Sequence, residues 1–188
     1  MRANQKKISA QLVILFIVIA LVVGFITDAI WDGIDRIIYP EKYHEIVVTY
    51  AKEYAVPTEL VFAVIKVESD FEPDAVSSAG AIGLMQMLPD TYSWLAYKNG
   101  DSTNPKMLYD PETSIRYGTY YLQYLYSRFG SWEKALIAYN WGEGNFSRFL
   151  EEHEYIEGEY SSIPISETRN YVKKVMHHWD KYIELYNN

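Results

Sequence analysis

Residues 68–89, ESDFEPDAVSSAGAIGLMQMLP, decide how this chain is expected to fold and what chemistry it offers. The stretch starts at Glu68, directly after the run 60–67, in which Lys66 is the only residue that is not apolar. A carboxylate is costly to place in apolar surroundings unless it is paired, hydrogen-bonded or protonated. Burial also raises the pKa of a carboxyl group, which lets it deliver a proton at neutral pH. Gly80 and Gly83 permit close approach of the backbone, so the sequence predicts a proton donor followed by a closely packed loop.

The composition is that of a folded protein, and it excludes several kinds of site. Of the 188 residues, 49% are hydrophobic and 22% are charged, a balance that disordered chains do not have. There is no cysteine, which excludes a disulfide framework, a thiolate nucleophile and a zinc site with Cys ligands. The four histidines form no His-Glu-x-x-His pattern. We therefore expect no catalytic metal.

The N-terminal segment has the length and composition of a membrane anchor. Residues 8–27 contain no charge, and as a helix they would extend about 30 Å, the thickness of the hydrocarbon core of a bilayer. Arg2, Lys6 and Lys7 precede this run, so the positive-inside rule keeps the preceding tail in the cytoplasm. The sequence thus predicts a cytoplasmic tail at 1–7, a single-pass transmembrane anchor in the cell membrane at 8–27, a stalk at 28–41 and an extracytoplasmic domain at 42–188.

Two other interpretations of this segment stay open. A cleaved signal peptide normally has a shorter apolar region and a small-x-small cleavage site, and FITDAIWD, residues 25–32, offers a poor one. A buried helix of a globular domain is disfavoured, because the stretch is apolar on every face.

The charge beyond the predicted anchor is strongly negative. All 25 acidic residues and 14 of the 17 basic residues follow residue 27, which gives this part a net charge of −11. Such a surface repels nucleic acid and anionic lipid headgroups. We therefore expect no nucleic-acid partner, and any polyanion would have to be held by a specific cleft.

The domain after residue 42 is predicted to be mainly α-helical. Apolar residues recur at helical spacing, and no segment alternates with the period of a strand. Asp110-Pro111-Glu112 is a strong helix start, and Gly130 is a typical helix end. The expected helices cover residues 43–54, 57–68, a short segment after Pro89 that ends before Gly100, 110–130, 131–140 and a last helix that begins at Ser166.

Three spaced motifs resemble the signature of the lytic transglycosylases, goose-lysozyme-like enzymes that cut peptidoglycan. The first motif runs from Glu68 to Pro89 and contains Glu-Ser and Gly-Ala-x-Gly-Leu-Met-Gln. ALIAYNWGEG, residues 135–144, carries Ala-Tyr-Asn-x-Gly, and ETRNYV, residues 167–172, completes the set in the same order. Ser114 stands where an Asn is common in the family. The resemblance covers about residues 43–185 and implies a mainly α, lysozyme-like fold of the goose type.

The resemblance also implies a reaction and a site. Glu68 would act as acid and then base on the β-1,4 bond that follows N-acetylmuramic acid in the glycan strands of peptidoglycan, giving a 1,6-anhydro sugar without a cofactor. Tyrosine and tryptophan faces suit sugar rings. The residues implied to bind substrate are Ser77, Met85, Gln86, Tyr139, Asn140, Glu167 and Tyr171.

Several of these residues have an equally ordinary structural interpretation. Met85 and Tyr171 could be core residues, Asn140 could cap a helix C-terminus, and an acid at Glu167 favours a helix N-terminus. At the level of function, a lysozyme-type muramidase and a non-catalytic wall-binding scaffold stay open. A muramidase would need a second carboxylate or a well-placed water, and the candidates for that carboxylate are Asp70, Glu72, Asp74 and Glu167.

Overall fold

The computed structural model describes residues 2–186, although the side chains of residues 2–14, 28, 29 and 32 lie outside the described part. The chain divides into two compact units, Met1–Pro40 and Glu41–Asn188.

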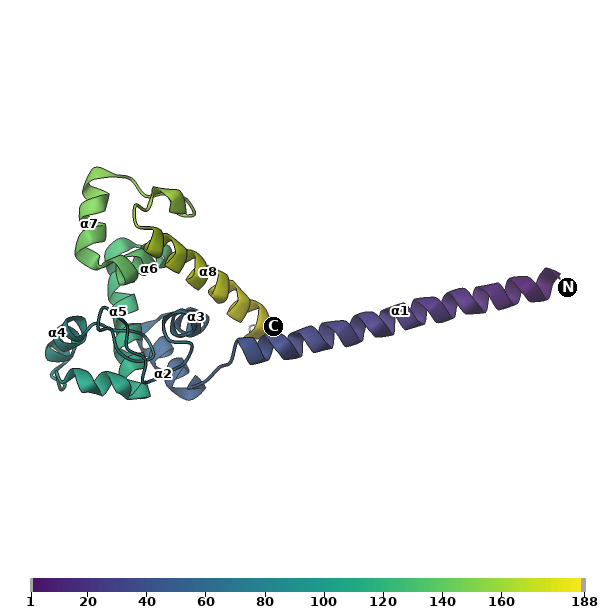
Figure 1. Ribbon diagram of the computed structural model, residues 1–188, viewed down its shortest axis with the longest axis horizontal. Helices are drawn as coiled ribbons and strands as arrows, with labels where there is room; N and C mark the ends of the chain where they lie inside the picture. The colour runs from purple at the N-terminus through teal and green to yellow at the C-terminus, as the bar shows by residue number, and fades with distance from the viewer. Residues whose placement is uncertain (1, 187–188) are drawn as a thin grey trace. The chain divides into compact units, whose positions relative to one another are not determined.

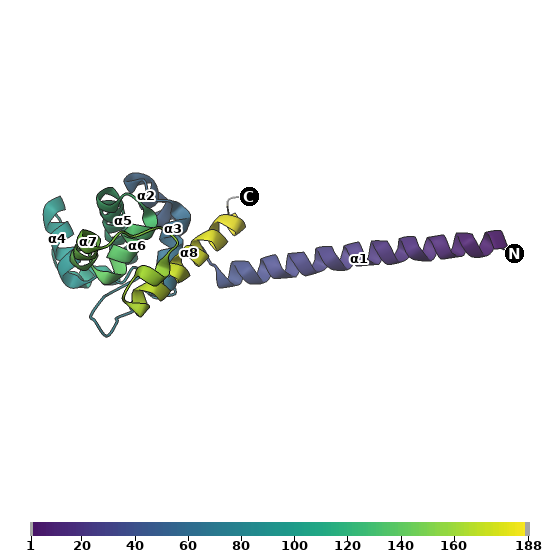
Figure 2. The ribbon, with the colours of Figure 1, turned by 90° about the horizontal axis from the view of Figure 1, so that it is seen from above.

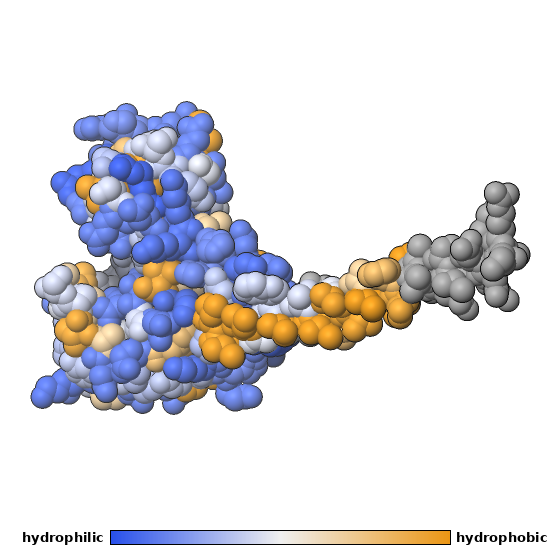
Figure 3. Space-filling model, turned by 45° about the vertical axis from the view of Figure 1, so that its right-hand side comes forward, coloured by the Kyte–Doolittle hydropathy of each residue, from blue (hydrophilic) through white to orange (hydrophobic). Residues whose placement is uncertain are grey.

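The first unit consists of one helix, α1 (Arg2–Ile38). It runs without a break through the predicted anchor and most of the predicted stalk, and it ends just before Pro40, which cannot continue a helix. Large apolar side chains are exposed along its described part, as the hydrophobic colouring in Figure 3 shows. They include Leu15, Phe16, Leu21 and Phe25.

The described residues do not support the predicted membrane span. Among the residues whose side chains are placed, no helix is long and apolar enough to cross a bilayer. The described part of the uncharged run is only 15–27, whereas a span requires about 20 apolar residues. The predicted cytoplasmic tail, 1–7, and the first part of the predicted span, 8–14, lie outside the described side chains.

The second unit is helical, which confirms the predicted fold class (Figure 1). In its described residues the only β-type pairing is two isolated bridges, Val76 with Ile82 and Ile82 with Met87. The α-helices are α2 (His44–Tyr54), α3 (Thr58–Glu68), α4 (Pro89–Asn99), α5 (Pro111–Phe129), α6 (Trp132–Trp141), α7 (Glu143–Glu152) and α8 (Ser166–Tyr186), with short 3₁₀ turns η1 (Pro105–Tyr109) and η2 (Tyr160–Ser162).

Local sequence signals set most of these helix ends. The Asp110 side chain caps α5 by accepting from the Thr113 amide at 2.9 Å, and Ser131 caps α6 by accepting from the Lys134 amide at 3.2 Å. Gly130 ends α5 with a left-handed backbone, φ 80°. These ends agree with the sequence prediction, whereas α7 was not predicted as a helix.

Helix α3 is the most buried element and positions the acid. Its residues from Leu60 to Ile65 are at most 1% exposed, because α8 packs along it and α2 lies beside it (Figure 2). Helix α5 packs against α2 and α6, and α8 also contacts α6. The ends of α3, α6 and α8 are thereby held within one core.

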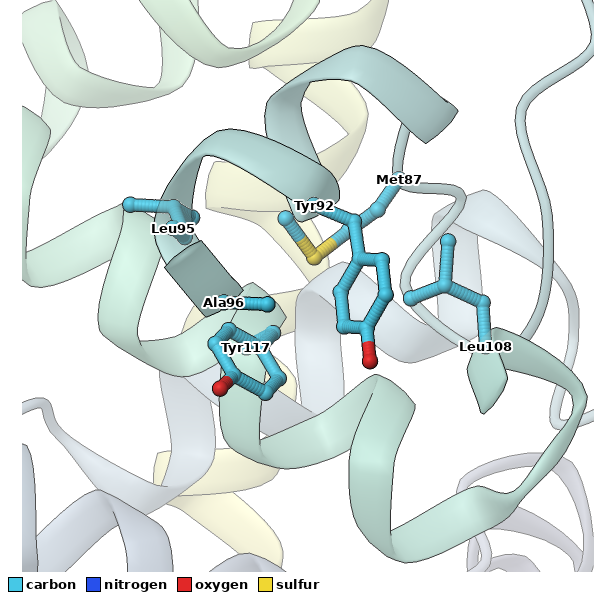
Figure 4. Packing of buried hydrophobic residues seen from close by; sticks show 6 residues of the cluster. All are labelled: Met87, Tyr92, Leu95, Ala96, Leu108 and Tyr117. Carbon is cyan, nitrogen blue, oxygen red and sulfur yellow. The ribbon is translucent and has the colours of Figure 1, made fainter. Parts of the chain in front are cut away.

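A smaller cluster fixes α4 against α5 and η1 (Figure 4). The rings of Tyr92 and Tyr117 meet edge to face with centroids 4.9 Å apart. The Tyr92 hydroxyl donates to the Ser102 carbonyl at 2.8 Å, and the Tyr117 hydroxyl donates to Asp101 at 2.6 Å. The start of α4 is therefore rigidly placed. The buried members of the cluster are Met87, Tyr92, Leu95, Ala96, Leu108 and Tyr117.

Candidate active site

Glu68 is the last residue of α3, and its carboxyl group has an unusual proton affinity. Burial raises its pKa from 4.5 to about 7, and the Tyr171 hydroxyl opposes part of this rise. Within the described part of the chain, no other charged group contributes to the pKa of Glu68. Both protonation states are therefore accessible near neutral pH.

Two tyrosines from other helices surround this carboxyl group. Burial raises the pKa of Tyr139 on α6 and of Tyr171 on α8 well above the usual value, and the Glu68 carboxylate adds to both rises. The Tyr139 hydroxyl donates to the Met85 carbonyl at 2.7 Å. The Tyr171 hydroxyl is buried and interacts electrostatically with Glu68. Among the described residues it has no partner with the geometry of a full hydrogen bond. Both phenols therefore stay protonated.

The loop after Glu68 is held in place by its own polar groups. Ser69 Oγ donates to the Leu84 carbonyl at 2.9 Å, which ties the start of the loop to its end. Gln86 has a left-handed backbone, φ 47°, and its Nε2 donates to the carbonyls of Ala75 at 3.0 Å and Gly83 at 2.9 Å. Thus Gln86 shapes the loop from inside.

Gly83 and Ser114 join this loop to the rest of the domain. A Cβ at Gly83 would overlap the Leu108 carbonyl oxygen, so only glycine allows this approach. Ser114 Oγ is buried and accepts from the Met85 amide at 3.2 Å. Ser114, which stands where the resemblance leads one to expect Asn, thus still supplies an acceptor to the loop.

A cavity of about 150 Å³ is lined in part by Tyr139, one of the two tyrosines beside Glu68. The Glu68 carboxylate also raises the pKa of the Tyr139 hydroxyl. Asn140 also lines the cavity, and its Oδ1 accepts from Thr168 Oγ1 at 2.8 Å. Glu68 itself does not line it. The lining residues are Gln86, Met87, Leu88, Thr91, Tyr121, Tyr139, Asn140, Trp141 and Gly142.

Glu68 is only partly exposed, its carboxyl group has a pKa near 7, and it lies beside two tyrosines, one of which lines the cavity. The family model described as "Transglycosylase SLT domain" matches residues 45–159, more than half of the chain. This chain belongs to the transglycosylase SLT domain family. Both the predicted resemblance and the lysozyme-like SLT fold are confirmed.

Relatives of the SLT domain carry names that refer to murein. This chain is 34% identical to the soluble lytic murein transglycosylase of Escherichia coli strain K12, over 80% of this chain and 24% of the relative. It is also 34% identical to membrane-bound lytic murein transglycosylase C of Haemophilus ducreyi, over 77% of this chain and 46% of the relative. The chain thus spans from about a quarter to about half of the length of these relatives.

Solved structures share the fold of the SLT domain. An inactive mutant of the lytic transglycosylase Slt from Pseudomonas aeruginosa superimposes with a TM-score of 0.73 and 31% identity, covering 79% of this chain and 25% of that one. A complex of the 70 kDa soluble lytic transglycosylase with bulgecin A gives a TM-score of 0.75 and 33% identity, covering 80% and 25%.

Three residues predicted to bind substrate do not line this cavity. Met85 is fully buried, and its sulfur occupies the space above Gly118, so its side chain belongs to the core. Ser77 is exposed, and its Oγ accepts from the Ala81 amide at 3.1 Å within the loop. Glu167 is exposed in the first turn of α8. By contrast, Gln86, Tyr139 and Asn140 come together at the cavity, and Tyr171 lies by Glu68.

The candidate second carboxylates of the SLT domain have other surroundings. Asp70 is exposed and forms an ion pair with Lys66 at 2.5 Å. Glu72 is exposed and accepts from the Asp74 amide at 3.3 Å. Neither Asp70 nor Glu72 contributes to the pKa of Glu68.

Sequence reasoning missed several residues of this site, among them Tyr121 and Thr168. Tyr121 on α5 lines the cavity and packs on Tyr139 with ring centroids 5.4 Å apart. Thr168 bonds to Asn140 from α8. The signal that could have found Thr168 is its place inside the ETRNYV motif, three residues before Tyr171.

Proposed function

We propose that this protein is a peptidoglycan lytic transglycosylase in which Glu68 is the only acid and base. The observation that carries the proposal is the Glu68 carboxyl group, whose burial raises its pKa to about 7 without help from a second carboxylate in the described residues. The names of the relatives support murein as the substrate.

The reaction starts with protonated Glu68. Its proton passes to the glycosidic oxygen that leaves the anomeric carbon of N-acetylmuramic acid, and the bond between that oxygen and carbon breaks. The acetamido oxygen of the same sugar stabilises the positive charge that develops at this carbon. The substrate thus supplies the group that a second carboxylate supplies in other glycosidases.

Glu68 then acts as a base. Its carboxylate takes the proton of the C6 hydroxyl of the same sugar as that oxygen bonds to the anomeric carbon. The product is a 1,6-anhydro sugar, water is not consumed, and Glu68 regains its proton. The Tyr171 hydroxyl, which stays protonated, stabilises the carboxylate between the two steps.

Product analysis tests the proposal. The full-length protein is incubated with purified peptidoglycan, and the released fragments are measured by mass spectrometry. We expect fragments that end in the anhydro sugar, one water lighter than hydrolysis products and without a reducing end. Reducing-end fragments would identify a muramidase instead, and binding without any release of fragments would identify a scaffold.

The substitution Glu68→Gln is the matched control for that experiment. The amide keeps the size and hydrogen bonding of the carboxyl group but cannot deliver its proton. We expect the variant to fold, to bind glycan and to release essentially no fragments. A solved relative is described as an inactive Glu-to-Gln mutant, which supports this choice of substitution.

We also propose that residues 8–27 attach the protein to the cell membrane, with the second unit on the cell-wall side. The support is the uncharged sequence of this run, the bases before it and the exposed apolar side chains from Leu15 to Ile26. Fractionation tests this proposal: the full-length protein should sediment with membranes and be released by detergent but not by high salt. Recovery in the aqueous fraction would overturn it.

A further inference from the structure

Thr168 is a buried polar residue to which the proposed reaction gives no role. It lies in the first turn of α8 and is only 1% exposed. Its hydroxyl donates to Asn140 Oδ1 on α6 at 2.8 Å. Because this hydroxyl occupies the acceptor end of a side chain that lines the cavity, it determines which end of that side chain can bond to a ligand.

In the structure the Thr168 hydroxyl donates to the carbonyl end of the Asn140 amide, which holds the amide in one orientation. An Asn side chain has a carbonyl end that accepts and an amino end that donates. Since the carbonyl end is held by Thr168, the amino end remains for other partners, and no group in the described chain is recorded as accepting from it. Because Asn140 lines the cavity, this amino group is available to a bound ligand.

The residues that line the cavity limit the kind of chemical group that can bind there. None of its lining residues is charged, and Met87, Leu88 and Trp141 give it apolar surface. An anionic ligand would therefore find no cation in this lining, whereas a neutral oxygen next to an apolar group is compatible with it. The acetamido group of an amino sugar has both parts.

We propose that Thr168 is a positioning residue that turns the Asn140 amide so that its amino group donates to a neutral oxygen of the glycan, the acetamido carbonyl being the best fit. The proposal rests on the proposed function for the identity of the ligand. Thr168 and Tyr171 are three residues apart on α8, and residues so spaced lie on one face of a helix. One helix face thus orients both the donor in the cavity and the hydroxyl beside Glu68.

The first test compares Thr168→Val with Thr168→Ser in the full-length protein. Valine keeps the volume of threonine but removes the hydroxyl, whereas serine keeps the hydroxyl. We expect kcat/KM on peptidoglycan to fall about tenfold for the valine variant, mainly through KM, and to be restored by serine. The pH dependence of the rate should not change, because Glu68 is untouched. A valine variant that loses thermal stability but keeps KM would overturn the proposal.

The second test asks whether Thr168 acts through Asn140. In an Asn140→Ala background the amide is gone, so Thr168→Val should weaken binding no further. Additive losses would overturn the proposal. The cycle is measured as the affinity for a soluble oligomer of N-acetylglucosamine and N-acetylmuramic acid in the Glu68→Gln background, where no turnover occurs. This binding measurement separates the two proposals. If the wild type released fragments with reducing ends, the proposed lytic transglycosylase reaction would be refuted, but the double-mutant cycle would still test the role of Thr168.

Discussion

The Tyr171 hydroxyl on α8 interacts with the Glu68 carboxyl group at the end of α3. Two influences therefore oppose each other at one carboxyl group. Burial raises its pKa, whereas the hydroxyl favours the ionised form and lowers it, and the result is a value of about 7. The proposed reaction, in which Glu68 first gives and then takes a proton, needs a balance of this kind.

Tyr171→Phe tests this balance. The change removes the hydroxyl but keeps the ring, so we expect activity to fall about 100-fold with little loss of stability. The pKa of Glu68 should rise, because the group that lowers it is gone. The alkaline limb of the pH–rate profile should then move to higher pH. The control is Tyr182→Phe, a buried tyrosine of the same helix that packs on Phe62, and it should leave that limb in place.

The raised pKa of Glu68 also leads us to expect that the free energy of unfolding depends on pH. The unfolded carboxyl group titrates near 4.5, whereas the folded one titrates near 7. Between these values the folded state binds the proton more tightly, so the free energy of unfolding falls as the pH rises through this window. Removing the charge should reverse the loss: Glu68→Gln should match the wild type near pH 4.5 and exceed its stability at pH 8 by up to about 3 kcal/mol. Urea unfolding at both pH values measures this. An equal difference at both would contradict the buried environment of Glu68.

Features encoded by neighbouring residues could be predicted from the sequence. The start of α5 at Asp110 and its end before Gly130 depend on caps within one turn. The environment of Glu68 was also predictable, because the residues before it, from Leu60 to Ile65, are all apolar and buried. Helix α7 was not predicted, although Phe146 and Phe149 stand at helical spacing, because Gly142 and Gly144 indicate a turn.

The arrangement of the site depends on contacts between distant segments, which periodicity does not specify. The motif containing Met85 suggested a cleft residue, yet packing against Gly118 places its side chain in the core. The spacing on α8 puts Thr168 and Tyr171 on one face of the helix. It does not predict their partners, which are Asn140 on α6 and Glu68 on α3. Only the docking of α8 on both helices brings these groups together.

Gly83→Ala is expected to destabilise the loop that follows Glu68. The backbone of Gly83 is left-handed, φ 81°, and the added methyl group would overlap the Leu108 carbonyl oxygen. Gly80 has nearly the same backbone, φ 79°, but open space around it, so Gly80→Ala should cost only about 1–2 kcal/mol. Gly83→Ala should cost about 1–3 kcal/mol more. Thermal unfolding of both variants measures the difference, and equal losses would show that the close approach to Leu108 contributes nothing.

Substitution of Glu133 is expected to lower the stability of the domain. It is a buried carboxylate on α6, only 6% exposed, and it accepts hydrogen bonds from the Tyr155 hydroxyl, the Gly158 amide at 2.8 Å and the Tyr160 hydroxyl at 3.1 Å. These bonds tie the segment before α8 to α6. Glu133→Ala leaves the three donors without their acceptor, so we expect a loss of about 3 kcal/mol and faster amide exchange at Gly158.

The matched control for Glu133 is Glu152→Ala, which removes an exposed carboxylate at the end of α7. It should change the free energy of unfolding by less than about 0.5 kcal/mol. Because the Glu133 contacts hold the approach to α8, its loss should also reduce activity below the unfolding temperature, through the placement of Thr168 and Tyr171. If exchange at Gly158 were as slow in Glu133→Ala as in the wild type, the segment would be held by its apolar contacts, such as Tyr155 on Phe146, and not by the buried carboxylate.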